Sequence, residues 1–322
     1  MPTVRLDFFL DPSARLTEQE RALMAGMLAD LVNSIGDEFR SRLGGLEPAN
    51  DEGEQLAQRL RRSGLLDIGD LVRLLLHRAE DERISTGLRA GREGSRPRFL
   101  QALVSDENAE ISAAAMALIL ARGRRRDRFG GPRILFDDLS AESAVVLVNA
   151  IAAALRTDLV KRLDPADADE RLGTASRSVL AGHDEGNRLE ARLFDLVHAL
   201  GEAGRLDESL IRSALDDGEA SLLGEALGRT AGISFQPAWE HLTGGSGGLA
   251  LLLRMSGSSR TLAGEVIARL AEVVAADPES EIAGFDSLSE QDVDSARKWL
   301  RLDPAYRSAI ETLASGHGQR SL

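Results

Sequence analysis

The densest group of side chains that could do chemistry is a cluster of six arginines within twelve residues. The cluster consists of Arg122, Arg124, Arg125, Arg126, Arg128 and Arg133. Asp127 is the one acidic residue within it, and Phe129 lies near its centre, just before Gly130 and Gly131. Planar guanidinium groups bind phosphate or carboxylate through paired hydrogen bonds, and a neighbouring aromatic ring can stack on a base. The cluster therefore indicates a candidate site for an anion or for a partner.

A structural explanation of the same cluster competes with the functional one. Arginines at a helix C-terminus complement the helix dipole, and Asp137, Asp138 and Glu142 follow closely enough to pair with them. The net charge of −13 also repels nucleic acid, because 27 acidic residues but only 16 basic ones follow Lys161. We therefore favour surface ion pairs and keep phosphate or nucleic-acid binding as the alternative.

The histidines offer little basis for metal or acid–base chemistry. The five are His77, His183, His198, His241 and His317. No two of them are spaced to share a helical face, whereas a zinc site needs at least three converging ligands, so we expect no metal. His77 lies on a predicted amphipathic helix beside Arg78 and is the best placed to accept a phosphoryl group. The simpler interpretation is a part-exposed helical histidine.

Several kinds of chemistry are excluded or unsupported. The chain has no cysteine, which excludes disulfides, cysteine-bound zinc and thiol catalysis. The glycine-rich stretch 244–248 lacks the Gly-Lys-Ser/Thr ending of a phosphate-binding loop. No apolar run reaches the roughly 18 residues of a membrane span, and Asp7 stands where a signal peptide would be apolar. We expect a cytoplasmic, non-enzymatic protein without cofactors.

Helix start and stop signals indicate which elements position these residues. Thr17 and Glu20 have the spacing of a capping box, and apolar residues at intervals of three and four follow as far as Phe39. This pattern predicts a long helix that ends near Arg42. Further helices are expected over 52–62, 68–78, 96–104, 109–122 and 140–162. The arginine cluster would then begin at the end of the helix over 109–122.

The second half of the chain shows weak internal similarity. Residues 227–234 align with residues 252–259, and residues 200–204 form a looser copy. Each copy predicts the end of a helix, a glycine turn and the cap of the next helix. The repetition predicts an all-α protein of stacked helical hairpins, a HEAT-like α-solenoid or a related multi-helical array. The alternative is that glycine and serine mark any turn between helices.

Domain limits follow from charge and capping. Asp164 and Pro165 have the types expected at a helix start, and they coincide with the change in charge. We therefore predict an N-terminal helical region over 1–163, an acidic helical-repeat region over 164–314 and a flexible tail over 315–322. Residues 3–10 alternate apolar and polar types, which predicts a short strand or an extended arm.

Three stretches, taken in order, resemble a known family. They are 15–23, which leads into the long helix; 108–112 followed by 124–129; and 285–288 leading to 299–306. The order of these stretches is similar to that of the bacterial domain-of-unknown-function family 2336. The resemblance implies an all-helical, repeat-like, cytoplasmic bacterial protein, and it supplies no established activity or site.

A functional expectation follows from these observations together. We expect a helical-repeat scaffold that binds a protein in bacterial signalling or regulation, because hairpins are predicted and no catalytic constellation is found. Its acidic second half would offer a concave surface to a basic partner. The sequence predicts neither the identity of that partner nor an oligomeric state.

Overall fold

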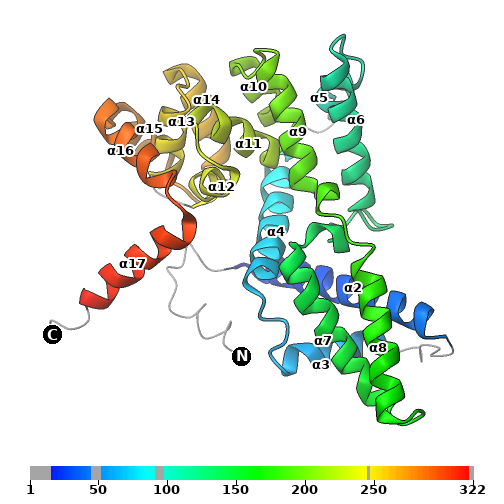
Figure 1. Cartoon of the computed structure of the whole chain (residues 1–322). Helices are drawn as coiled ribbons and strands as arrows, with labels where there is room; N and C mark the ends of the chain where they lie inside the picture. Colours follow the sequence, from blue (N-terminus) through cyan, green and yellow to red (C-terminus); the bar gives the residue numbers. More distant parts are fainter. Residues whose placement is uncertain (1–15, 45–51, 91–97, 245–246, 319–322) are drawn as a thin grey trace. The chain divides into compact units, whose positions relative to one another are not determined.

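The computed structural model describes residues 16–44, 52–90, 98–244 and 247–318. These residues form sixteen α-helices and two short 3-10 helices and contain no β-strand, which confirms the predicted all-α class (Figure 1). None of the described helices is long and apolar enough to cross a membrane. The strand or arm expected over residues 3–10 lies outside the described residues.

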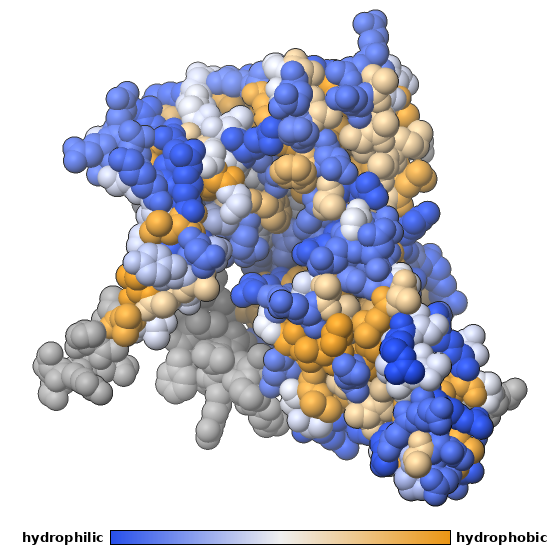
Figure 2. Space-filling model, in the orientation of Figure 1, coloured by the Kyte–Doolittle hydropathy of each residue, from blue (hydrophilic) through white to orange (hydrophobic). Residues whose placement is uncertain are grey.

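The described residues form two compact units, each assembled from separate stretches of the chain. Unit 2 comprises Leu16–Arg83 and Ala113–Arg192. Four of its helices pack on one another: α2 (Glu18–Leu43), α3 (Glu52–Arg62), α7 (Ala141–Leu159) and α8 (Pro165–Leu180). Phe39, Leu147 and Ile151 are among the largest side chains fully buried in this core. Val145 and Val146 of α7 are exposed, and Figure 2 shows apolar side chains gathered over this helix.

Other elements complete unit 2 around the arginine cluster. They are the first part of α4 (Gly69–Arg89), most of α6 (Ala109–Arg124), η2 (Phe136–Asp138), η3 (Glu185–Asn187) and the start of α9 (Leu189–Glu202). The 3-10 helices η2 and η3 pack against each other. α4 continues well past residue 78, where its end was predicted, because Ala79, Ile84 and Leu88 extend its buried face through a charged stretch.

Local capping explains where the predicted helices begin. Thr17 Oγ1 accepts a hydrogen bond from Glu20 N at 3.1 Å, and the Glu20 carboxylate accepts one from Thr17 N at 2.8 Å. This reciprocal pair is the predicted capping box at the start of α2. α8 begins at Pro165, with Asp164 accepting from Ala166 N at 3.0 Å. Both predicted starts are therefore confirmed, whereas the division into domains at residue 163 stays a prediction.

Unit 1 contains the described residues of 84–112 and of 193–318. Its further helices are α5 (Phe99–Val104), α10 (Glu208–Asp217), α11 (Ala220–Ala231), α12 (Phe235–Thr243), α13 (Gly248–Met255), α14 (Arg260–Leu270), α15 (Pro278–Ser287), α16 (Glu290–Leu300) and α17 (Pro304–Gly318). α13 packs against α11, α12, α14, α15 and α16 and is therefore central to this unit. α17 runs to Gly318, so it overlaps the tail predicted over 315–322.

The start of α13 is capped by a residue distant in sequence. The N-cap residue, Gly247, has no side chain that could cap this helix. Instead, the fully buried carboxylate of Glu281, on α15, accepts hydrogen bonds from Gly247 N and from Ala250 N, the latter at 2.8 Å. A carboxylate satisfies amide groups that have no partner within the helix, and it is favoured by the helix dipole. The buried charge of Glu281 therefore fixes α15 against the start of α13.

The three turns that align in the sequence share one conformation. Gly204, Gly232 and Gly257 have φ angles of 67°, 71° and 73°. After each glycine, an amide donates to the carbonyl five residues earlier: Arg205 to Leu200 at 2.8 Å, Ile233 to Gly228 at 3.0 Å and Ser258 to Leu253 at 3.1 Å. These bonds close the preceding helix and confirm the predicted glycine turns.

In unit 1, the backbone at Gly218 lies very close to the last part of α4. Its φ is +67°, and an added Cβ would lie 2.8 Å from Ser85 O and 2.7 Å from Arg89 Cγ. We expect Gly218→Ala to lower the free energy of unfolding by more than about 2 kcal/mol, because backbone strain and overlap add. Gly204→Ala is the control, since its φ is also +67° but the added Cβ meets nothing within 4 Å. Urea denaturation measures both variants, and equal losses would contradict the close approach.

Candidate functional site

The six clustered arginines lie in different environments, and Arg125 is the buried one. Its side chain is 5% exposed. Arg125 Nε donates to both carboxylate oxygens of Asp138, at 2.8 and 2.9 Å. Its remaining nitrogens donate to the carbonyls of Ala121 at 2.9 Å and Asn187 at 2.7 Å. The pairing with Asp138 confirms, for this arginine, the ion pair that the sequence suggested.

Asp138 joins several parts of unit 2. It is fully buried in η2 and accepts backbone hydrogen bonds from Leu135 N at 3.0 Å and from Leu189 N at 3.2 Å. With Arg125, it connects the end of α6 to η2 and to the start of α9. A buried carboxylate needs partners of this kind, because the loss of hydration is otherwise too costly.

A second ion pair extends the network to α4. Arg78 is buried, and its Nη2 lies 2.8 Å from Glu190 Oε1 and 3.8 Å from Asp138 Oδ1. Burial by itself raises the pKa of Glu190, but the charge of Arg78 and the neighbouring His77 outweigh it and hold that pKa well below its usual range. Burial likewise disfavours the charge on Arg78, yet Glu190 and Asp138 raise its pKa. The folded protein therefore holds both groups in their charged forms.

His77 belongs to this network. Its side chain is only 10% exposed, and Nδ1 lies 3.6 Å from Glu190 Oε1. A phosphoryl donor must reach a ring nitrogen, so this burial favours a structural role, and the phosphoacceptor role stays a prediction. Elsewhere, His183 Nε2 lies 3.1 Å from Leu139 O and His198 Nδ1 lies 2.8 Å from Arg229 Nη2. The described part of the chain contains no group of three side chains able to hold a metal ion.

The network anchors an ordered loop, residues 124–133, which we call the Arg loop. Arg133 N donates to Arg125 O at 2.9 Å, and Asp127 N donates to Gly131 O at 2.9 Å, so the two arms of the loop are paired. Asp127 Oδ1 accepts from Phe129 N at 2.7 Å and from Gly131 N at 2.8 Å. The loop thus satisfies much of its own backbone around one aspartate.

The tip of the Arg loop presents an aromatic ring to solvent. Phe129 is 82% exposed, and the guanidinium carbon of Arg128 lies 4.6 Å from the centre of its ring. Among the described residues, Arg124 and Arg128 have no ion pair. Two others form ion pairs: Arg126 Nη1 lies 2.6 Å from Glu82 Oε2, and Arg133 Nε lies 3.9 Å from Asp30 Oδ2. Arg122 is half-buried in the last turn of α6 and also has an interaction partner. The cluster therefore offers two free cations and one exposed ring.

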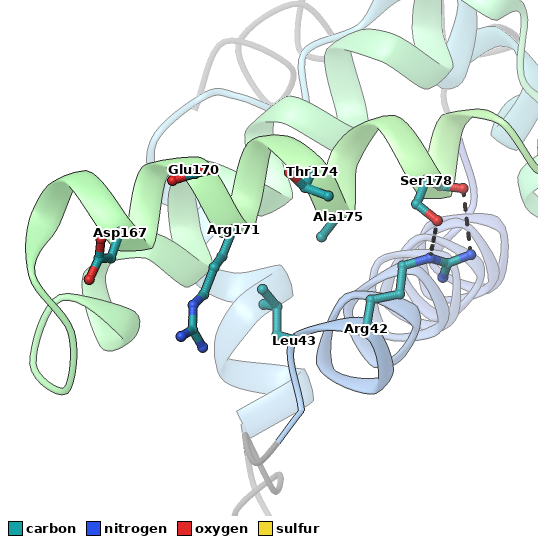
Figure 3. A pocket seen from close by; sticks show the side chains of 8 residues that line it. All are labelled: Arg42, Leu43, Asp167, Glu170, Arg171, Thr174, Ala175 and Ser178. Atoms are coloured by element: carbon teal, nitrogen blue, oxygen red, sulfur yellow. Dashed lines mark hydrogen bonds between the residues drawn. The ribbon is translucent and has the colours of Figure 1, made fainter.

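An open groove lies between α2 and α8 in unit 2 (Figure 3). Arg42 borders it, donating through Nε to Ser178 Oγ at 2.8 Å. Asp167, Glu170 and Arg171 also line it and mix both signs of charge, and all three are exposed. Exposed groups of opposite sign define no particular ligand, so the Arg loop is the stronger candidate.

Two adjacent arginines provide a matched test of the network. Arg125→Ala leaves Asp138 buried without its main partner, so we expect the free energy of unfolding to fall by about 3–5 kcal/mol. Arg124→Ala removes an exposed side chain with no ion pair, and we expect a change within about 0.5 kcal/mol. Urea denaturation distinguishes the two. Similar losses in the two variants would show that burial does not determine how much each arginine stabilises the fold.

The Glu190–Arg78 pair predicts a pH dependence. Because the folded pKa of Glu190 is lowered, its stabilising effect is full above the unfolded value of 4.5 and is lost as the pH falls below it. Glu190→Gln should therefore be much less stable than the original chain near about pH 7, and the difference should shrink towards about pH 3. Chemical denaturation across this range measures it, with Glu142→Gln, an exposed carboxylate on α7, as the control. A difference that is constant with pH would contradict the pairing.

Comparisons with known proteins give one match. Neither the curated proteins nor the solved structures contain a match to this chain. A family described as an uncharacterised protein conserved in bacteria, DUF2336, matches residues 93–294. The match covers more than half of the 322 residues and includes α5 to α15, the Arg loop and Glu281. The chain therefore belongs to the bacterial DUF2336 family, as its ordered sequence stretches predicted.

Proposed function

We propose that this protein is a non-enzymatic helical scaffold in bacterial signalling or regulation, and that it binds a protein partner through the Arg loop. The observation that carries the proposal is Phe129, which is 82% exposed at the tip of a loop held by its own hydrogen bonds. An exposed aromatic ring adds little buried apolar surface to the fold, whereas aromatic residues commonly anchor protein interfaces.

The loop is suited to such an interface because it is already ordered. Arg125 is fixed by Asp138, and Asp127 holds the turn, so binding would cost little conformational entropy. Aromatic residues and arginine are the types that dominate binding energy at interfaces. The free guanidinium of Arg128 beside Phe129 favours a partner with an apolar pocket bordered by carboxylates.

The arrangement of the scaffold is part of the same proposal. In unit 1, consecutive helices pack in pairs, namely α10 with α11, α11 with α12, α12 with α13 and α14 with α15. The shared glycine turns at Gly204, Gly232 and Gly257 add to this pattern. We propose a HEAT-like stack of hairpins, whose acidic residues after Lys161 would offer a second surface to a basic partner.

Phosphate or nucleic-acid binding by the arginine cluster is less well supported. Arg125 is buried, and Arg126 and Arg133 lie near acidic residues. Arg124 and Arg128 have no ion pair among the described residues, and two free cations neutralise few phosphates. The cytoplasmic location remains part of the proposal on the sequence alone.

A partner-binding assay tests the Arg loop. A native extract is passed over the immobilised full chain, and the affinity of the captured protein is then measured. We expect Phe129→Ala to weaken binding by about tenfold or more, because truncating an interface anchor costs about 2 kcal/mol. Phe194→Ala, which truncates a half-exposed aromatic on α9, serves as the control.

Two outcomes would argue against this function. Capture that is unaffected by Phe129→Ala would remove the Arg loop from the interface. Retention of the chain on a polyphosphate column, lost in the double variant Arg124→Ala/Arg128→Ala, would favour anion binding instead.

A further inference from the structure

Helix α6 carries an exposed apolar face. No charged residue lies between Glu110 and Arg122. Ala113, Met116 and Leu120 recur at helical spacing on the exposed side, where Met116 is 43% and Leu120 is 59% exposed. Figure 2 shows apolar side chains gathered over this helix.

The opposite side of α6 packs into the protein core. Ile111, Ala115 and Leu118 are fully buried on that side. The exposed stripe is therefore additional apolar surface, and two long side chains on one helix face form a patch that a partner typically covers.

The charges at the two ends of α6 indicate which partner fits. Glu110 lies in the first turn and Arg124 at the last residue of this 16-residue helix. Both are exposed, and neither has an ion pair among the described residues. The stripe thus begins with an unpaired anion and ends with an unpaired cation.

We propose that α6 of one copy packs antiparallel on α6 of a second copy about a two-fold axis. The axis would pass between Met116 and Ala117. Ala113 of each copy then lies opposite Leu120 of the other, and Glu110 lies one residue from the position opposite Arg124. Each long side chain meets a small one, and both helix dipoles run in opposite directions. A parallel arrangement would instead place like charges together.

This interface adjoins the Arg loop at Arg124, but it does not use Phe129, and its partner is a second copy rather than a different protein. It uses the body of α6, whereas the proposed partner contacts the tip of the Arg loop. The two proposals can therefore fail independently, because self-association is measured on the purified chain alone, whereas partner binding is measured with an extract.

Sedimentation velocity of the full chain over about a hundredfold range of concentration tests the dimer. We expect the original chain to dimerise, and Leu120→Glu to weaken dimerisation by tenfold or more by placing a carboxylate in the apolar stripe. Val146→Glu makes the same change at a half-exposed valine on α7 and should have no effect. Circular dichroism and thermal unfolding confirm that each variant is folded.

A charge exchange tests the antiparallel direction. Glu110→Arg and Arg124→Glu should each weaken the dimer, since each places like charges close to one another. The double variant Glu110→Arg/Arg124→Glu should restore it, because both pairs are re-formed in reverse. A chain that is monomeric throughout overturns the proposal, even if α6 variants lose capture of another protein. A dimer indifferent to Leu120→Glu, or one not restored by the exchange, overturns it as well.

Discussion

The buried carboxylate of Asp138 is the constraint on which much of unit 2 depends. A charge at this depth is tolerated only with several partners, and Asp138 takes the guanidinium of Arg125 and two backbone amides. These partners belong to the end of α6, to η2 and to the start of α9. One side chain therefore sets how three segments meet. The position of the Arg loop, and so of Phe129, follows from this pairing.

The local features of the fold could be predicted from the sequence because each depends on neighbouring residues. The capping box of Thr17 and Glu20 spans four residues, and the Asp164 cap lies next to Pro165. Glycine turns are equally local, since a left-handed φ excludes most other residue types. The Arg125–Asp138 pair also lay within reach of sequence reasoning, being separated by only 13 positions.

The remaining features depend on contacts that the sequence does not display. Nothing in the Arg cluster indicates that Arg125 is buried while Arg124 is exposed, because the two differ only in the direction of their side chains. The pairing of Arg78 with Glu190 joins residues from α4 and α9, and no motif marks either of them. The sequence around His77 shows only Arg78 beside it, whereas in the structure the side chain lies next to Glu190. Tertiary packing decided these positions.

The carboxylate that caps α13 also has a consequence for the order of folding. Glu281 follows Gly247 by 34 residues, so at about 5–20 residues per second it is synthesised about 2–7 seconds later. Until then, Gly247 N and Ala250 N lack the carboxylate that accepts their hydrogen bonds. A nascent chain that ends after α14 therefore carries an unfinished central helix. The cap of α13 can therefore form only after α15 has been synthesised, whereas the turns at Gly232 and Gly257 are closed by bonds to residues that come just before them.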